Sequence, residues 1–352
     1  MSIIKYLITG GAGFIGSNFI RNLLNRHQEI KILNFDKLTY AGNLNNLSDL
    51  EKDIRYSFVK GDICDIKKTE NVFNQFHPDY VVNFAAESHV DKSIHYPDVF
   101  VTSNVLGVQN LLQISLQQGV KKYLQISTDE VYGSLGAEGL FTEKTLLDPS
   151  SPYSASKASA DLLTQAYFHT FNLPINITRC SNNYGPYQFP EKLIPLTILN
   201  CLKGRKIPVY GDGLNVRDWI HVDDHCSAID LVLHNGVVGE IYNVGANNER
   251  SNIEIVKLII QILAELRSDL KISEALISYV EDRKGHDRRY AIDSTKIQST
   301  FYWKPKIDFN YGLTETIKWY LHHQEWLNSV INNDYLTYYD NNYGKNKFVL
   351  LS

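Results

Sequence analysis

Two groups of residues in the middle of the chain have the types and spacing needed for proton transfer. Thr128, Asp129 and Glu130 stand in succession in the stretch ISTDEVYGS. Tyr153 and Lys157 lie four residues apart in YSASK, so they share one face if the segment is helical. A lysine beside a phenol favours the phenolate, which can take a proton from a hydroxyl group as a hydride leaves. Taken singly, the first group also fits a plain turn and the second a surface helix.

A glycine-rich loop near the N-terminus indicates the cofactor for such chemistry. TGGAGFIG follows an apolar segment at residues 3–9, and Gly11, Gly13 and Gly16 satisfy GxGxxG. Glycines at this spacing allow a tight turn and a close approach of the backbone to a pyrophosphate at a helix N-terminus. Asp36 lies twenty residues after Gly16, where a carboxylate can accept hydrogen bonds from an adenosine ribose and repel the extra phosphate of NADP. The pattern therefore predicts NAD binding.

The elements that must position these residues alternate along the first half of the chain. Segments typical of strands lie at 3–9, 30–35, 56–61, 80–86 and 121–127, and segments typical of helices at 14–26, 66–76 and 98–118. This rhythm predicts an α/β fold with a Rossmann-type doubly wound parallel sheet, which binds ligands beyond the carboxyl ends of its strands. Because consecutive side chains of a strand face opposite sides, Asp129 and Glu130 can reach one substrate only if the strand has ended.

The second half of the chain loses this alternation. We expect a long helix over about 151–172 and a strand in NLPINITR, after which the sequence becomes rich in loops and prolines. We predict a NAD-binding domain over 1–180 with a return segment near 218–247, interleaved with a smaller mixed α/β substrate-binding domain over 181–328. We expect the last helix over roughly 312–326. Residues 329–352 form a tail whose structure the sequence does not predict.

Composition and charge argue against several classes of function. The 352 residues carry a net charge of -4, which provides no basic surface for nucleic acid or for a membrane. The N-terminus lacks the pattern of a secretion signal and no run of about 18 apolar residues occurs, so we expect a soluble, cytoplasmic protein. The four cysteines form no CxxC pair, which favours reduced thiols over zinc or disulfides.

One histidine pair calls for a separate interpretation. His221 and His225 flank Asp223 and Asp224, a combination that occurs in metal sites. We interpret this segment as a strand that leads into a helix, with Asp223 or Asp224 as the N-cap, and predict that no metal is bound.

Longer blocks of sequence resemble a known family. TGGAGFIG together with YSASK resembles the extended short-chain dehydrogenase/reductase superfamily. DKLTYAGN, AAESHVDKSI, ISTDEVYGS, RCSNNYGPYQFPEKLIP, GDGLNVRDWIHVDDH and DRKGHDRRYAID narrow the resemblance to its dTDP-glucose 4,6-dehydratases, up to about residue 327. The resemblance implies a homodimeric hydro-lyase of deoxysugar biosynthesis. It would oxidise a nucleotide-linked glucose at C4 with tightly bound NAD, remove water across C5 and C6, and return the hydride to C6.

The resemblance also implies roles for single residues. Thr128 would hydrogen-bond the C4 oxygen, Asp129 would be the acid at O6 and Glu130 the base at C5. Tyr153 would take the proton of the C4 hydroxyl, and Lys157 would hold the nicotinamide ribose. The implied cofactor-binding residues are Gly10, Gly13, Phe14, Ile15, Gly16, Asp36, Lys37, Leu38, Thr39, Asp62, Ile63, Ala85, Ala86, Ser103, Tyr153, Lys157 and Asn183. The implied substrate-binding residues are Ser88, Thr128, Asn182, Lys192, Leu193, Pro208, Tyr210, Arg217, Asn252, Arg283 and His286.

Several alternatives remain at this point. A 4-epimerase would share the glycine loop, Tyr153 and Lys157, but it needs no acid and base at C5 and C6. A dehydratase for UDP- or CDP-linked glucose would carry almost the same motifs, and Asn252 also fits a plain helix cap. We expect dimerisation through the helices near 98–118 and 151–172.

Overall fold

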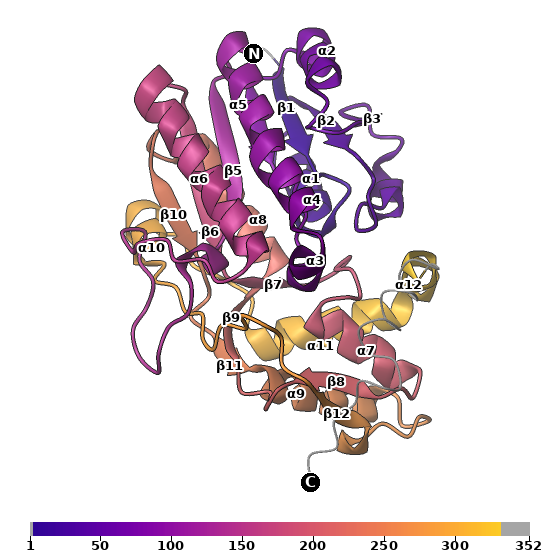
Figure 1. Cartoon of the computed structure of the whole chain (residues 1–352). Helices are drawn as coiled ribbons and strands as arrows, with labels where there is room; N and C mark the ends of the chain where they lie inside the picture. The colour runs from indigo at the N-terminus through magenta and orange to yellow at the C-terminus, as the bar shows by residue number, and fades with distance from the viewer. Residues whose placement is uncertain (1–2, 332–352) are drawn as a thin grey trace.

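Seven parallel strands form the main sheet, in the order β10-β6-β5-β4-β1-β2-β3 (Figure 1). The computed structural model describes residues 3–331. The strands are β1 Ile4–Thr9, β2 Ile30–Asp36, β3 Tyr56–Lys60, β4 Tyr80–Asn83, β5 Lys122–Thr128, β6 Ile175–Cys180 and β10 Ile241–Val244. The strand order reverses between β1 and β4, which is the topological switch point where such sheets bind ligands. The predicted Rossmann-type sheet is thereby confirmed.

Helices cover both faces of this sheet. Helices α1 Phe14–Arg26 and α8 Val222–Asn235 pack together on one face, and α2 Ile66–Phe76, α5 Gly107–Gln118 and α6 Pro152–Phe171 lie on the other. The side chains of β1 explain the arrangement: Tyr6 and Ile8 belong to the core with α1 and α8, whereas Leu7 belongs to the core on the opposite face. A strand covered on both faces is mostly apolar, and in β1 the consecutive residues Tyr6, Leu7 and Ile8 are all buried.

The helical stretch Pro97–Gln118 contains α4 Pro97–Val101, a π-helical turn Thr102–Leu106 and α5. By length and composition this segment could cross a membrane, with a mean hydropathy of 1.3 over its most apolar window. Half of that window is buried inside the protein, and Phe100, Val108 and Leu111 belong to the apolar core. The segment is therefore a core helix that covers the sheet.

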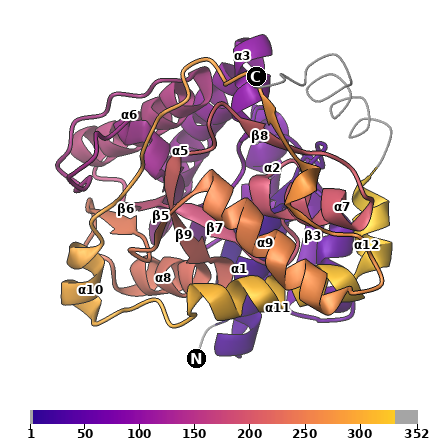
Figure 2. The same ribbon diagram turned by 90° about the horizontal axis from the view of Figure 1, so that it is seen from below.

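A second group of elements lies beyond the carboxyl ends of the main sheet. Its core contains α7 Leu193–Leu202, α9 Asn252–Leu266, α11 Phe309–His322 and α12 Gln324–Val330, packed around the parallel pair β8 Ile207–Tyr210 and β12 Ile277–Val280. A further small sheet has the order β11-β9-β7, with β7 Asn182–Tyr184, β9 Val216–His221 and β11 Glu249–Ser251. Seen from below, α7, α9 and α11 lie in front of the main sheet (Figure 2).

The chain passes between the two groups more than once. Strand β9 leads directly into α8, which packs on α1, and β10 then joins the edge of the main sheet next to β6. The remaining short elements are α3 Val90–His95, α10 Thr295–Phe301 and the 3-10 turns Leu44–Leu50, Asp129–Tyr132 and Glu274–Leu276. The domain boundaries given above stay predictions.

Two local expectations near helix ends were wrong. The N-cap of α8 is His221, whose Nδ1 accepts the backbone N–H of Asp223, so neither Asp223 nor Asp224 is the cap. The terminal helix, expected over roughly 312–326, is two helices that meet at His323, where the backbone leaves helical geometry. Of the tail predicted over 329–352, the first residues end α12, and residues 332–352 lie outside the described part of the chain.

Candidate active site

Strand β5 ends at the point where two neighbouring carboxyl groups begin. Its last residue is Thr128, and the chain turns at once into the 3-10 turn Asp129–Tyr132. Thr128 Oγ1 accepts the backbone N–H of Glu130 at 3.3 Å and donates to Asp129 Oδ1 at 3.2 Å. Gly133 then leads the chain away with a φ of +84°, a conformation that favours glycine. Because the strand has ended, Asp129 and Glu130 line the same cavity.

The two carboxyl groups lie in different electrostatic surroundings. Burial and then the neighbouring Glu130 raise the pKa of Asp129 well above its usual value. Burial also raises the pKa of Glu130, but the cationic groups of Lys192, Arg217 and Arg283 oppose that rise. A carboxyl group that tends to stay protonated, next to one that is more readily ionised, suits paired acid and base roles.

Tyr153 and Lys157 reach the same cavity from helix α6. Ser151 caps this helix through a capping box with Ser154, and Pro152 occupies the first turn, so the first turn is fixed where Tyr153 projects. One helical turn later, Lys157 Nζ donates to the carbonyl of Ile126 on β5 at 2.6 Å. The helix therefore holds both side chains against the end of the strand.

The charges around Tyr153 oppose its ionisation. Burial, followed by the carboxyl groups of Glu130 and Asp129, raises the pKa of Tyr153 well above its usual value, while a hydrogen bond with Thr128 lowers it. Burial also lowers the pKa of Lys157. The sequence predicts that Lys157 favours the phenolate; in the structure burial and the two carboxyl groups work against that effect.

The glycine loop between β1 and α1 has the shape of a pyrophosphate cradle. Gly10 has a φ of +67°, and a Cβ atom on it would lie 2.5 Å from the backbone nitrogen of Ala85. A Cβ atom on Gly13 would meet only the carbonyl of Gly10, at 3.3 Å, so the outer side of the loop is open. The loop thus packs closely against the residues that directly follow β4, while leaving room for a phosphate group at the N-terminus of α1.

Asp36 occupies the position of a ribose-binding carboxylate. It ends β2, lines the same cavity as the glycine loop, and accepts backbone N–H groups from Leu38 at 2.8 Å and Ala12 at 3.0 Å. Asp62 lines this cavity as well and also shapes a local turn, since its carboxylate accepts the backbone N–H of Cys64 at 2.9 Å. The loop, Asp36 and the open space between them fit the adenosine diphosphate part of NAD.

The structure brings most predicted site residues together. All five predicted catalytic residues line the first cavity, as do Ser88 and every predicted cofactor-binding residue except Leu38. A second cavity shares Glu130, Asn182 and Lys192 with the first and is lined further by Leu193, Tyr210, Arg217, Asn252, Arg283 and His286.

Three of the predicted residues need comment. Leu38 lines neither of these cavities; it has a φ of +56° and its backbone N–H is bonded to Asp36. Pro208 is buried within β8, two positions before Tyr210, and lines neither cavity. Asn252 lines the second cavity, and the cap of helix α9 is Ser251, not Asn252.

Three further polar residues of the site were missed by the sequence analysis. Tyr290 donates to the carboxylate of Asp287 at 2.5 Å, and its ring lies 4.2 Å from the guanidinium group of Arg217. Glu191 lines both cavities, and burial raises its pKa to about 7. The charged pair Glu191 and Lys192 within the otherwise apolar segment FPEKLIP was the available signal, but the resemblance implies a role for Lys192 alone.

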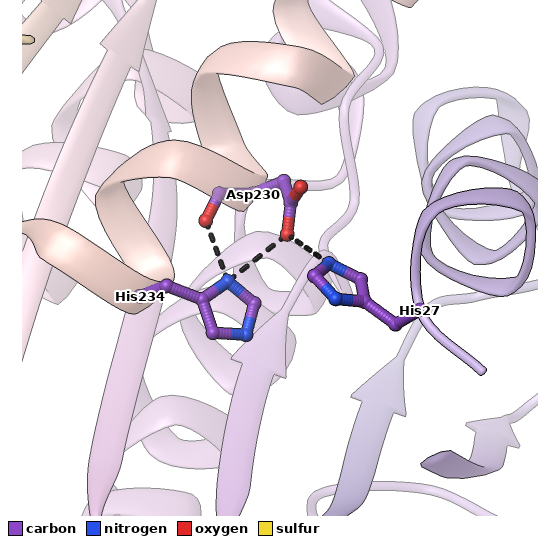
Figure 3. Close-up of side chains that lie close together, drawn as sticks. All are labelled: His27, Asp230 and His234. Atoms are coloured by element: carbon purple, nitrogen blue, oxygen red, sulfur yellow. Dashed lines mark hydrogen bonds and ion pairs between the residues drawn. The ribbon is translucent and has the colours of Figure 1, made fainter. Parts of the chain in front are cut away.

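The histidines His221 and His225 do not form a joint site. His221 caps α8, and Nδ1 of the buried His225 is 2.8 Å from Asn183 Oδ1. A different group of potential metal ligands, His27, Asp230 and His234, lies at the far end of α1 from the glycine loop (Figure 3).

The contacts in this second group favour a hydrogen-bonded cluster over a metal site. Asp230 Oδ1 lies 3.0 Å from His27 Nε2 and 3.0 Å from His234 Nδ1 (Figure 3). His234 Nδ1 also faces the backbone carbonyl of Asp230 at 2.8 Å, while its Nε2 meets the hydroxyl of Tyr6 at 2.8 Å. A nitrogen that faces a carbonyl and a carboxylate at these distances carries a proton, and a protonated nitrogen cannot bind a metal.

The glycine loop, Asp36, Tyr153 and Lys157 on a Rossmann-type sheet define a short-chain dehydrogenase/reductase. Comparison with known proteins narrows this class. The family model described as GDP-mannose 4,6 dehydratase matches residues 7–316. A dTDP-glucose 4,6-dehydratase of Xanthomonas campestris pv. campestris (strain B100) is 50% identical over 341 residues, which cover 94% of this chain and 97% of that protein.

Solved structures give the same result. The dTDP-glucose 4,6-dehydratase of Bacillus anthracis str. Ames, crystallised with NAD, is 51% identical with a TM-score of 0.85, over 93% of this chain and 99% of that one. The enzyme of Streptomyces venezuelae, also with NAD bound, is 45% identical with a TM-score of 0.88, over 93% of this chain and 100% of that one. The chain belongs to the dTDP-glucose 4,6-dehydratase family.

Proposed function

We propose that the chain is an NAD-dependent hydro-lyase that converts dTDP-D-glucose into dTDP-4-keto-6-deoxy-D-glucose. The observation that carries the proposal is the end of β5 at Thr128, which places Asp129 and Glu130 in one cavity with Tyr153 and Lys157. An acid and a base beside an oxidation site are what removal of water next to a new ketone requires.

Each catalytic side chain has one task in this reaction. Tyr153 takes the proton of the C4 hydroxyl, whose oxygen Thr128 holds by a hydrogen bond. The ketone formed at C4 acidifies the hydrogen at C5, which Glu130 removes. Asp129, whose pKa is raised by burial, gives its proton to the C6 hydroxyl as it leaves as water. When bound, NAD would accept the hydride from C4 and return it to C6 while C5 regains a proton, so the cycle would consume no external reductant.

The second cavity holds the nucleotide part of the substrate in this proposal. Arg217 and Arg283 line it, and planar guanidinium groups bind diphosphate oxygens in pairs. Arg217 is oriented by a bond of 3.0 Å to the carbonyl of Asp287, and Arg283 by an ion pair of 2.5 Å with Asp91. These contacts fix the directions of the two guanidinium groups in the second cavity, where their charges also act on Glu130.

A homodimer is the oligomeric state that the surface supports. Large apolar side chains are exposed on two neighbouring helical segments, Val101 at 57% and Leu106 at 48% on one and Leu162 at 57% on α6. An exposed apolar patch of this kind suits contact with the same patch of a second copy. Light scattering in solution tests this: twice the mass of the chain is expected, and the mass of a single chain contradicts it. The unpaired state of all four cysteines supports a cytoplasmic location.

A panel of dTDP-, UDP-, CDP- and GDP-glucose with product identification tests the proposed reaction. We expect a 4-keto-6-deoxy sugar, formed fastest from dTDP-glucose and without added reductant. An epimer in place of that product, or turnover of UDP- or CDP-glucose alone, would contradict the proposal.

A further inference from the structure

Tyr40 connects the cofactor side of the site with the substrate side. It belongs to the loop after β2, in which its neighbours Thr39 and Ala41 line the first cavity. Tyr40 itself reaches across to Glu191, 151 positions away in the sequence, and donates a hydrogen bond to its Oε1 at 3.0 Å. Glu191 lines both cavities and directly precedes Lys192. The contact therefore joins two segments that have separate binding tasks.

The loop that carries Tyr40 is built on the predicted ribose-binding carboxylate. Asp36 accepts the backbone N–H of Leu38, and a Cβ atom on Gly42 would lie 2.9 Å from Asp36 Oδ1. Gly42 also donates its N–H to the carbonyl of Thr39 at 3.0 Å, which closes a turn around Tyr40. The direction of the Tyr40 side chain is thus tied to the position of Asp36.

The aromatic ring of Tyr40 is held from two sides. Lys92 Nζ lies 3.0 Å from the ring centre, a cation–π contact, and the ring of Phe189 meets it edge to face at 5.5 Å. Both neighbours come from segments other than the Tyr40 loop. These contacts hold the ring without its hydroxyl group, so the hydroxyl can be removed while the ring stays in place.

Glu191 is a buried carboxyl group whose protonation depends on a small number of neighbouring groups. Its side chain is 2% exposed, and its Oε2 lies 3.7 Å from Nε2 of His89, whose pKa burial holds well below its usual value. Burial raises the pKa of Glu191 to about 7, while Lys192, Lys92 and the hydrogen bond from Tyr40 lower it and Glu87 raises it. Loss of the Tyr40 hydroxyl therefore raises the pKa of Glu191.

We propose that Tyr40 is a positioning residue that fixes the carboxyl group of Glu191 between the two cavities. The loop that holds the cofactor ribose then also sets a carboxyl group that faces the nucleotide sugar. This inference rests on the proposed function. Its consequence is that the substrate cavity takes its final shape only when the loop around Asp36 is in place.

The variant Tyr40→Phe removes the hydroxyl and leaves the ring on Lys92. Loss of a hydrogen bond to a charged or partly charged group predicts a fall in kcat/KM of about 10-fold or more. In the parent protein the hydrogen bond from Tyr40 lowers the pKa of Glu191, so its loss raises that pKa. The limb of the pH profile that reports the ionisation of Glu191 is therefore expected to move to higher pH. The matched control is Tyr311→Phe, since Tyr311 is 65% exposed on α11, and this control keeps the profile of the parent protein.

The double variant Tyr40→Phe/Glu191→Gln separates positioning from a general structural effect. If Tyr40 acts through Glu191, the double variant has the kcat/KM of Glu191→Gln alone. The proposal is overturned if the fall in kcat/KM of the double variant equals the product of the falls in the two single variants. It is also overturned if the pH profile of Tyr40→Phe coincides with that of the parent protein. Thermal unfolding of each variant shows whether the fold is retained.

Binding of dTDP to the same variants keeps this test independent of turnover. Calorimetric titration across the pH range is expected to show a shifted pH dependence of the dissociation constant in Tyr40→Phe and none in Tyr311→Phe. If the parent protein forms no 4-keto-6-deoxy product, the proposed function fails while this binding measurement still decides the role of Tyr40. Identical pH dependence in Tyr40→Phe and the parent overturns that role.

Discussion

Replacing Glu130 with glutamine isolates the proposed proton transfer at C5. The substitution keeps the size of the side chain, and the bond from Glu130 to Thr128 is retained because it uses the backbone N–H. What is lost is a carboxylate placed among Lys192, Arg217 and Arg283. We therefore expect Glu130→Gln to fold like the parent protein and to lack the base.

The structure predicts that Glu130→Gln slows proton removal at C5 but does not slow oxidation at C4. Loss of a general base slows proton removal by about 10²- to 10⁴-fold, which corresponds to roughly 3 to 5 kcal/mol of transition-state stabilisation. Oxidation at C4 is expected to persist, because the charge of Glu130 is the leading electrostatic cause of the raised pKa of Tyr153. Removing that charge lowers the pKa of Tyr153 and so favours its role as the proton acceptor.

Single-turnover reactions in deuterated water measure both halves at once. Mass spectrometry of the quenched sugar is expected to show the 4-keto species in Glu130→Gln with little deuterium at C5. Glu315→Gln is a matched control, since Glu315 is a surface residue of α11 that pairs with Lys318. Normal deuterium entry at C5 in Glu130→Gln would refute Glu130 as the base. Loss of C4 oxidation as well would show that the substitution damages the site as a whole.

Two further predictions concern the cofactor loop and the charged cluster at the far end of α1. Gly10→Ala places a Cβ atom 2.5 Å from the backbone of Ala85 at a φ of +67°. It is expected to destabilise the fold by about 1 to 3 kcal/mol and to abolish copurification of NAD, measured by thermal unfolding and by the absorbance of the released cofactor; normal NAD content would contradict the assigned cradle. In the cluster, burial works to lower the pKa of His234 but hydrogen bonds with Asp230 raise it above its usual value. Burial works to raise the pKa of Asp230, but its two histidine partners bring it below its usual value. The contribution of Asp230 to the free energy of unfolding is therefore lost as the pH falls through its lowered pKa. The contribution of His234 is lost as the pH rises through its raised pKa. The cluster stabilises the protein most between about pH 4 and pH 6.5. His234→Asn is expected to cost about 1 to 2 kcal/mol of unfolding free energy at pH 5.5 and less at pH 8.5, followed by urea unfolding; an equal cost at both pH values would contradict this account.

The sequence predicts the parts of the site that depend on local pattern. The alternation of apolar and periodic segments predicts the parallel sheet, and the glycines with Asp36 predict the cradle at its switch point. The adjacent acids Asp129 and Glu130 also predict the end of β5, since a continuing strand would turn them to opposite faces. In each case the signal lies in one short stretch of the chain or in one strand–helix–strand unit.

The parts that the sequence does not predict depend on contacts between distant segments. The bond between Tyr40 and Glu191 joins two loops whose relative position follows from the packing of the second group of elements on the sheet. His221 replaces the aspartates as the cap of α8, because Asp224 accepts the backbone N–H groups of Lys306 and Ile307 instead. Periodicity in the sequence does not indicate which of several polar residues will form a hydrogen bond with a distant segment.

The most direct test of the central claim is the product formed from dTDP-glucose by the purified protein without added NAD or reductant. The account predicts a 4-keto-6-deoxy product with one solvent deuterium at C5 when the reaction runs in deuterated water. Turnover that requires stoichiometric external NADH, or a product that keeps its C6 hydroxyl group, would contradict it.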